Sequence, residues 1–256
     1  MIKEASRFAS STIFEGMTSV RALIDNLKSD KPNARKIEKI LYDEAKLAKK
    51  GKEIGYLKKM GEIFGFPVVA TTEKEISSLS IGASHGGIIA FGGEREYPSI
   101  DENSIKENGF YVMIEGIEDP YNFGYAMRSI YASGVDGFIL SKRNWLSASG
   151  VVCRSSAGAS ERADIYIASD DFIEIFKNKN YKIVCADIKN SISIYEADLK
   201  KPIFLIVGGE KRGISSSVLS QADQIVRIDY GRDFDAALSA ASASTIIAFE
   251  VFKQNK

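Results

Sequence analysis

Residues Ile114–Leu140 read IEGIEDPYNFGYAMRSIYASGVDGFIL, and this stretch decides the fold class. Its spacing predicts a strand, a polar turn, an amphipathic helix over Tyr125–Ser133 and a second strand over Gly137–Leu140. The turn holds residue types that favour turns: Asp119, Pro120, Asn122 and Gly124. The helix then presents Arg128. An amide and a guanidinium at the end of a strand suit the binding of a polar ligand.

The same order of strand, polar or Gly-rich turn and helix returns in Ile203–Ser215 and Ile228–Phe249. Further apolar strands are predicted at Phe110–Glu115, Ile165–Ile167, Tyr181–Ala186 and Gln224–Ile228, and further helices at Asp170–Asn178, Ser216–Ala222 and Ala236–Phe252. This alternation predicts a mostly parallel sheet covered by helices on both faces. Ligands bind at the carboxyl ends of strands in such sheets, and all three polar turns fall there.

The first ninety residues also alternate between helical and strand patterns. Helices are predicted over Val20–Asn26, Ala34–Ala48 and Glu73–Leu79, and strands at Phe66–Ala70 and within Ser84–Phe91. The following segment, Gly92–Gly109, is polar and contains Pro98. We therefore expect a small α/β domain at residues 1–98, a linker at 99–109 and a larger α/β domain at 110–256.

Composition is that of an ordinary soluble globular protein, with 45% apolar and 27% charged residues. No apolar run approaches the roughly 18 residues that a membrane helix needs. The N-terminus, MIKEASRFASS, lacks the apolar core of a signal peptide. We expect a cytoplasmic protein without membrane association. Cys153 and Cys185 are too few for a disulfide framework and are expected to be small buried residues, and no Cys/His cluster indicates a metal.

The net charge is zero, which argues against coating nucleic acid through bulk electrostatics. Charge is uneven, however, because Lys28–Lys59 contains 11 Lys or Arg residues and 5 Asp or Glu residues. This local excess fits two interpretations: a solvated helix face, or an RNA-facing patch on the small N-terminal domain.

The Gly-rich segment at residues 208–215, GGEKRGIS, departs from a phosphate-binding loop. Gly208 and Gly213 have the right spacing, but Ile214 occupies the position of the phosphate-binding lysine. No G-x-G-x-x-G follows a predicted strand elsewhere. These departures argue against a nucleotide triphosphatase and a dinucleotide-dependent dehydrogenase.

Three segments resemble the three motifs of the SpoU/TrmH family, within the SPOUT class of methyltransferases. Residues 119–124, DPYNFG, together with Arg128, are similar to the first motif, which carries an Asn and an Arg. Residues 207–214, VGGEKRGI, are similar to the second, a G-x-E-x-x-G pattern. Residues 228–244 resemble the third, in which Ser-Leu-Asn or Ser-Leu-Ser opens the last helix. The likeness runs from about residue 110 to residue 252 and is specific in combination.

The resemblance implies transfer of a methyl group from S-adenosylmethionine to a ribose 2′-hydroxyl of RNA. It also implies a homodimer, a SPOUT domain with a trefoil knot that forms the cofactor pocket, and an L30e-like N-terminal domain that binds substrate RNA. Residues 84–90, SHGGIIA, are similar to a Thr-His-Gln-Gly stretch that closes that accessory domain. A dedicated N-terminal domain suits docking on a structured RNA, which favours ribosomal over transfer RNA.

By the same resemblance, the cofactor contacts are Val207, Gly208, Gly209, Ile228, Leu238 and Ser239. The catalytic candidates are Arg128, Asn122, Glu210 and Ser239. A guanidinium stays protonated in proteins, so we expect Arg128 to hold the RNA phosphate and stabilise charge on the 2′-oxygen, not to act as a base. Asn122 would hold the ribose or Arg128, and Glu210 would orient Arg128.

Each of these residues also has a plainer explanation. Ile228 and Leu238 fit core packing, Asn122 fits turn chemistry, and Glu210 fits a helix cap. Residues 154–158, RSSAG, resemble a segment between the first two motifs of the family. If the homodimer holds, Arg154 and the stretch 145–162 are the expected interface or cross-subunit elements; a surface ion pair is the alternative for Arg154.

The third motif departs from the family pattern. Ala237 and Ala241 stand where family members usually carry serine, and Ser239 stands at the Asn position. Two hydroxyl groups expected near the reacting centre are therefore missing, unless Ser242 or Ser244 takes their place. This departure favours the alternative of an RNA-binding relative with reduced or no methyltransferase activity. A small-molecule enzyme on an unrelated α/β fold is the third possibility.

Overall fold

The computed structural model describes residues 12–29, 33–82, 84–141, 148–209 and 213–256. Within these ranges the chain divides into two compact units. The first unit contains the described residues up to Glu96 together with 148–162; the second contains the remaining described residues. Each unit has its own sheet and helices, so the α/β class predicted from the sequence is confirmed. The domain limits at residues 98 and 110 stay a prediction.

The first unit is built on a four-stranded sheet of order β1-β4-β2-β3, in which only β2 and β3 are parallel neighbours. Its strands are β1 (Ile13–Glu15), β2 (Ile37–Asp43), β3 (Val68–Thr71) and β4 (Ile88–Gly92). Its helices are α2 (Gly16–Lys28), η1 (Glu44–Lys46), α3 (Leu47–Phe64), α4 (Glu73–Leu79), α6 (Ser149–Ser155) and α7 (Ala159–Arg162). Helices α6 and α7 contact α2, and Cys153 of α6 is fully buried in this unit's core.

The helix predicted over residues 34–48 is wrong for the first part of this stretch, because Ile37–Asp43 form β2 and helical structure begins only at Glu44. The pairing of β2 with β4 shifts register between Ile37 and Lys39, as at a β-bulge. Ile37 and Ile40 are both buried, although residues three apart in a regular strand point to opposite faces. The strand therefore shows the spacing of buried residues that is typical of a helix. The prediction over Glu73–Leu79 is confirmed as α4, with the Thr72 hydroxyl accepting a hydrogen bond from the Glu75 N–H as N-cap.

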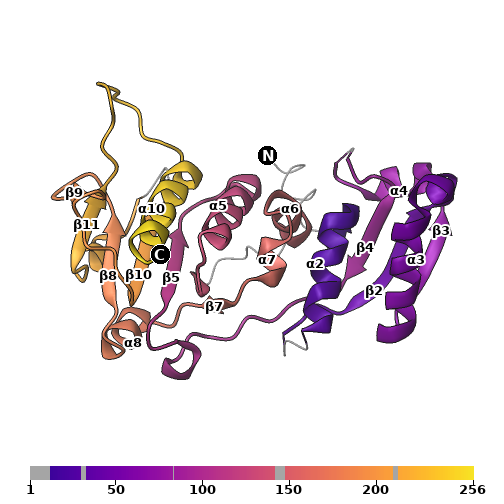
Figure 1. The fold of residues 1–256 in the computed structure, drawn as a ribbon, viewed down its shortest axis with the longest axis horizontal. Helices are drawn as coiled ribbons and strands as arrows, with labels where there is room; N and C mark the ends of the chain where they lie inside the picture. The colour runs from indigo at the N-terminus through magenta and orange to yellow at the C-terminus, as the bar shows by residue number, and fades with distance from the viewer. Residues whose placement is uncertain (1–11, 30–32, 83, 142–147, 210–212) are drawn as a thin grey trace. The chain divides into compact units, whose positions relative to one another are not determined.

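The second unit is a seven-stranded sheet of order β7-β6-β5-β10-β8-β11-β9, and every pairing is parallel (Figure 1). Its strands are β5 (Phe110–Glu115), β6 (Gly137–Leu140), β7 (Ile165–Ile167), β8 (Lys182–Ala186), β9 (Ile192–Ser193), β10 (Ile203–Gly208) and β11 (Gln224–Arg227). Its helices are η2 (Glu102–Ser104), α5 (Pro120–Ala132), α8 (Phe172–Asn178), α9 (Ser216–Leu219) and α10 (Ala240–Gln254). The parallel sheet is confirmed, and the knot implied by the resemblance stays a prediction.

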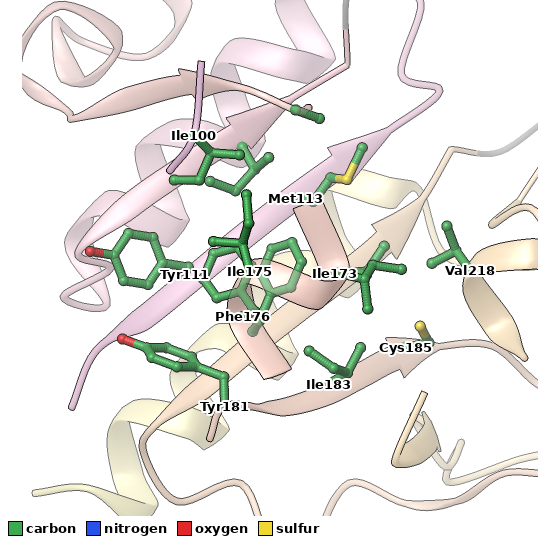
Figure 2. Packing of buried hydrophobic residues seen from close by; sticks show 14 of the residues in the cluster. Ile100, Tyr111, Met113, Ile173, Ile175, Phe176, Tyr181, Ile183, Cys185 and Val218 are labelled. Carbon is green, nitrogen blue, oxygen red and sulfur yellow. The ribbon is translucent and has the colours of Figure 1, made fainter. Parts of the chain in front are cut away.

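The main core of this unit lies between one face of the sheet and helices α8 and α9. Phe176 of α8 stacks on Phe204 of β10, with ring centroids 3.9 Å apart, and Tyr111 and Tyr181 pack beside it (Figure 2). Strand residues alternate between faces, so their neighbours point to the other side, where α10 contacts β10 and packs against α5. With both faces covered, the carboxyl ends of the strands are the edge left for a ligand.

Helix α5 begins earlier than its apolar pattern predicts. The Asp119 carboxylate caps it by accepting hydrogen bonds from the N–H groups of Tyr121 and Asn122, and Pro120 occupies the first turn. Asn122 and Gly124 were predicted in the turn but belong to the helix. The polar side chains of the first motif therefore project from a rigid helical turn directly after β5.

Candidate functional site

A pocket of about 600 Å³ lies at the carboxyl ends of β8, β10 and β11 in the second unit. Its wall is formed by the strand ends and by the loop that leads from β11 into α10. The residues that line it include Ala186, Asp187, Ile188, Val207, Gly208, Gly209, Gly213, Ile228, Tyr230, Phe234, Ala237, Leu238, Ala240 and Ile247. The volume is typical of pockets that bury a small organic ligand, about 300 to 1000 Å³.

Backbone contact between neighbouring turns shapes the floor of this pocket. A Cβ atom at Gly209 would lie 2.2 Å from the Gly116 carbonyl oxygen, and one at Gly208 would lie 2.5 Å from the Gly213 carbonyl carbon. The Gly213 N–H donates to the Gly209 carbonyl oxygen. These glycines are therefore required by close approach of the backbone to itself. The contact also joins the end of β10 to the turn before α5.

Carboxylates stand on the pocket wall beside apolar side chains. Asp187 follows β8, and its side chain accepts a hydrogen bond from the Lys189 N–H. The Ser193 hydroxyl and the Arg227 guanidinium hold the pKa of Asp229 below its usual value, so this group is ionised at neutral pH. Val207, Leu238 and Ile247 supply the apolar surface. The lining holds four aspartates, Asp187, Asp229, Asp233 and Asp235, and two arginines, Arg227 and Arg232, of which Arg227 pairs with Asp229. An apolar interior bordered by this excess of negative charge suits an organic cation.

The structure brings five of the predicted cofactor contacts together on the pocket wall: Val207, Gly208, Gly209, Ile228 and Leu238. Ser239, the sixth, caps α10, where its hydroxyl accepts a hydrogen bond from the Ser242 N–H. Arg128 and Asn122 project from α5 and are not on the pocket wall. Arg128 is exposed and makes no ion pair or hydrogen bond with the described residues. Glu210 lies outside the described residues.

Sequence reasoning missed several pocket residues. Asp187 and Ile188 directly follow a strand that was predicted correctly, so the rule that ligands bind at strand ends could have found them. Tyr230 and Phe234 lie in the loop before α10, and no spacing signal distinguishes them.

Arg154 forms a partly buried ion pair within the first unit, and its contact with a partner subunit or with RNA stays a prediction. Its guanidinium pairs with the Glu15 carboxylate and donates to the Ser84 hydroxyl, all within the first unit. The part of the 145–162 stretch that begins at residue 148 packs in that unit, and residues 145–147 lie outside the described residues.

Residues 82–86, GASHG, match the G-x-S-x-G pattern of hydrolase nucleophiles but not its geometry. Ser84 is engaged by Arg154, and the His85 ring faces the Ser77 hydroxyl at 3.3 Å while its Nδ1 accepts the Gly87 N–H. The motif also precedes a strand, not a helix. This segment therefore does not form a catalytic triad.

Both cysteines are buried and unpaired, as predicted, and burial raises the pKa of Cys185 to about 12. Across the described residues, no three His, Cys, Asp or Glu side chains converge as a metal site requires. None of the helices in the described ranges is long and apolar enough to cross a bilayer.

Comparison with known proteins supplies the family. A family model described as the SpoU rRNA Methylase family matches residues 109–249. A protein of Staphylococcus saprophyticus that is named as a member of the TrmH family of tRNA/rRNA methyltransferases is 28% identical over 225 residues, covering 85% of this chain and 88% of that protein.

Two solved structures share the fold. An rRNA methyltransferase from Sinorhizobium meliloti with bound S-adenosylmethionine superposes with a TM-score of 0.72 at 23% identity, covering 94% of this chain and 86% of its own. An RNA 2′-O ribose methyltransferase superposes with a TM-score of 0.75 at 20% identity, covering 99% and 95%. The pocket at the strand ends, the second and third motif segments that line it and the match over residues 109–249 agree: this chain belongs to the SpoU rRNA methylase family.

Proposed function

We propose that this protein transfers a methyl group from S-adenosylmethionine to a ribose 2′-hydroxyl of RNA, with ribosomal RNA as the preferred substrate. The observation that carries the proposal is the pocket at the ends of β8, β10 and β11, which the second and third motif segments line. Membership of the SpoU family supports RNA methylation. The structural neighbour that is described as an RNA 2′-O ribose methyltransferase supports the choice of the ribose hydroxyl.

The pocket fits S-adenosylmethionine in size and chemistry. Val207, Ile228 and Leu238 offer apolar surface for the adenine, and the backbone of the Gly208–Gly209 turn offers polar groups at its edge. Asp187 and Asp229 are anions on the wall, and the cofactor carries a sulfonium and an ammonium. When bound, the cofactor supplies an activated methyl group, and the protein's task is to hold the ribose oxygen in line with it.

Arg128 is the residue best suited to hold the RNA. Its guanidinium is exposed and, among the described residues, unpaired, so it is free to bind a phosphate. It remains protonated and would stabilise negative charge that develops on the 2′-oxygen. Asn122 stands nearly two turns earlier on α5 and would contact the ribose or Arg128. We place Glu210 in the supporting role of orienting Arg128.

We further propose that a second copy of the chain covers the exposed face of α5 and α10. These helices pack against each other (Figure 1). Each exposes large aromatic side chains: Tyr121 and Tyr125 on α5, Phe249 and Phe252 on α10. Exposed aromatic groups on adjacent helices mark an interaction surface. Arg128 shares helical spacing with Tyr121 and Tyr125, so a homodimer through this face would bring Arg128 to the interface.

The first unit offers features suited to RNA docking. Lys28 lies 4.9 Å from the Tyr56 ring centroid and donates to the Tyr56 hydroxyl, and Arg21 lies 5.6 Å from the same ring. A cationic group beside an aromatic ring suits both phosphates and bases. Other lysines of the basic stretch pair with acidic neighbours, as Lys46 does with Glu73, which supports the solvated-face interpretation for part of it.

One observation favours the alternative of an RNA-binding relative with little or no methyltransferase activity. Ala237 presents a methyl group to the pocket where family members usually have a serine hydroxyl, and the Ser239 hydroxyl is engaged in capping α10. The wall near the expected reacting centre is therefore poorer in polar groups than the family pattern implies.

The test is transfer of labelled methyl from S-adenosylmethionine to total RNA from cells that lack this protein, with Arg128→Ala beside wild type. Label in RNA with wild type alone supports the proposal, and nuclease mapping with analysis of the modified nucleoside then identifies the position. Cofactor binding without label in any RNA favours the binding-only alternative. Equal labelling by wild type and variant contradicts the role of Arg128.

A further inference from the structure

The loop between β11 and α10 carries an unusual pair of aromatic side chains. Residues 228–239 form neither strand nor helix, and Figure 1 shows this segment projecting beyond the sheet. Tyr230 is 39% exposed and Phe234 is 57% exposed, and both line the pocket. Their ring centroids lie 6.1 Å apart with an angle of 52° between the planes. Two large aromatic rings therefore face solvent at the rim of the pocket.

The aromatic pair is held in place by the backbone at the start of the last helix. The Tyr230 hydroxyl accepts a hydrogen bond of 3.1 Å from the Leu238 N–H. This bond closes the loop from one end of the pair to the residues that open α10. Because Tyr230 is fixed in this way, its ring is held in a defined position beside Phe234, which lowers the conformational cost of binding a flat partner.

The surroundings select the chemistry of that partner. Phe234 lies between Asp233 and Asp235, whose charges repel phosphates, so an uncharged aromatic group fits this position best. Arg232 also lines the pocket and is exposed, and it makes no ion pair or hydrogen bond with the described residues. A partner that places an uncharged aromatic ring on Phe234 and a phosphate near Arg232 has the chemistry of a nucleotide. Its base must be unpaired, because a paired base is stacked inside a helix and cannot reach the ring. Aromatic side chains commonly stack on such bases in single-stranded RNA.

The adenine of the cofactor is the competing partner. The pocket interior already offers an apolar wall from Val207, Ile228 and Leu238, where a ring would be enclosed. Phe234 remains more than half exposed at the rim, so it would bury little of an adenine ring that must stay bound through catalysis. The rim position suits a group that arrives from solution and leaves again with the product.

We propose that Tyr230 and Phe234 form a stacking platform for an unpaired base of the RNA substrate at the mouth of the cofactor pocket. This inference rests on the proposed function, because it takes RNA as the substrate. The stacked base would limit substrates to RNA that is single-stranded or can be opened at the methylated site. Arg232 would contact the phosphate beside that base.

The experiment compares two fluorescent probes by anisotropy in the presence of S-adenosylhomocysteine. One probe is an oligoadenylate about 12 nucleotides long, within the usual span of single-strand sites. The other is an abasic oligomer of equal length, which keeps the phosphates and lacks the bases. Phe234→Leu removes aromaticity and keeps an apolar side chain, and Phe234→Tyr restores a ring. Tyr195→Leu is the matched control, because Tyr195 is 59% exposed in the same unit and is not on the pocket wall.

The expected result is that Phe234→Leu weakens oligoadenylate binding by about 5- to 150-fold, the range for one lost stacking contact. Phe234→Tyr and Tyr195→Leu should bind like wild type, and the abasic probe should bind all four proteins equally. Four results overturn the proposal: wild type binds both probes alike, Phe234→Leu binds oligoadenylate like wild type, Phe234→Leu weakens both probes equally, or it changes the oligomeric state.

Calorimetry with S-adenosylmethionine separates this inference from the proposed function. An equal affinity for the cofactor in wild type and Phe234→Leu supports the base as the partner. A parallel loss of cofactor affinity assigns the ring to adenine and overturns the inference. If wild type does not bind the cofactor at all, the proposed function fails, while the comparison of the two RNA probes still decides the stacking platform.

Discussion

Glu161 and Arg35 form an ion pair that is almost entirely removed from solvent, with side chains 1% and 3% exposed and a distance of 3.3 Å between Oε1 and Nη2. Arg95 Nη1 lies 3.8 Å from the other carboxylate oxygen of Glu161. These partners are 126 and 66 residues from Glu161 in the sequence. One buried carboxylate therefore joins α7 to two distant segments of the first unit.

Glu161→Gln should destabilise the protein by about 3 to 5 kcal/mol, because it leaves two buried guanidinium groups without their anion. The measurement is urea unfolding followed by circular dichroism, with tryptophan fluorescence as a second probe of cooperativity. Asp25→Asn is the control, since it breaks the pair between Asp25 and Arg162, whose side chains are 44% and 31% exposed and so far more accessible to solvent than Glu161 and Arg35. Exposed pairs contribute under about 1 kcal/mol, so equal losses in the two variants would refute the special role of Glu161.

Gly209→Ala should abolish cofactor binding or weaken it at least about tenfold. A tenfold loss of affinity corresponds to about 1.4 kcal/mol of binding free energy. The new Cβ atom would lie 2.2 Å from the Gly116 carbonyl oxygen and force apart the turns that follow β5 and β10. Calorimetry with S-adenosylmethionine gives the affinity. The control is Gly231→Ala in the loop between β11 and α10, because a Cβ atom at Gly231 would meet no atom within 4 Å. Wild-type affinity in Gly209→Ala would show that the turn tolerates the shift.

Most of the parallel sheet was predictable because its strands are continuous apolar runs with polar or glycine boundaries. Phe110–Glu115, Gly137–Leu140 and Ile165–Ile167 have the predicted limits. The start of α5 was missed because Asp119 and Pro120 favour turns, and the same two residues also cap and open a helix. The residue types at 119 and 120 therefore located the first motif, but they did not decide between a turn and the first turn of a helix.

The candidate site was predictable in part. Resemblance to the second and third motifs led to Val207, Gly208 and Leu238, which the structure brings to one pocket wall; their contact with the cofactor stays a prediction. The exposure of Arg128 and the positions of Tyr230 and Phe234 depend on tertiary packing. Periodicity reports which face of an element is buried, and it carries no information about which exposed residue stands beside a pocket.

Asp136→Asn should destabilise the second unit in a pH-dependent way. Burial raises the pKa of Asp136, but the hydrogen bonds from Lys106 and the Phe110 N–H, with the charges of Lys106 and Lys201, outweigh it and hold the pKa below its usual 3.8. A lowered folded-state pKa means that the stabilisation is present above the unfolded-state pKa and is lost as pH falls through the folded-state value.

The expected cost of Asp136→Asn at neutral pH is about 2 kcal/mol, the range for hydrogen bonds to a charged group. Urea unfolding at a series of pH values between about 7 and 3 should give a difference from wild type that is constant at first and shrinks below the usual carboxyl pKa. Asp198→Asn is the control, because Asp198 pairs with Lys182 at an exposed site and should change stability much less. A difference that stays constant down to the lowest pH would contradict the assignment.

Ser239→Ala should cost about 1 kcal/mol of stability, because it removes the side chain that caps α10 through the Ser242 N–H. Ser239→Asn should keep that stability, since asparagine is an equally good N-cap, and it restores the Ser-Leu-Asn pattern that the third motif resembles at this position. Thermal unfolding and methyl transfer to RNA are measured on the same preparations. Loss of activity in Ser239→Ala in proportion to its lost stability assigns Ser239 a structural role. If Ser239→Asn is as stable as wild type but changes turnover, the side chain at this position acts on the reaction itself.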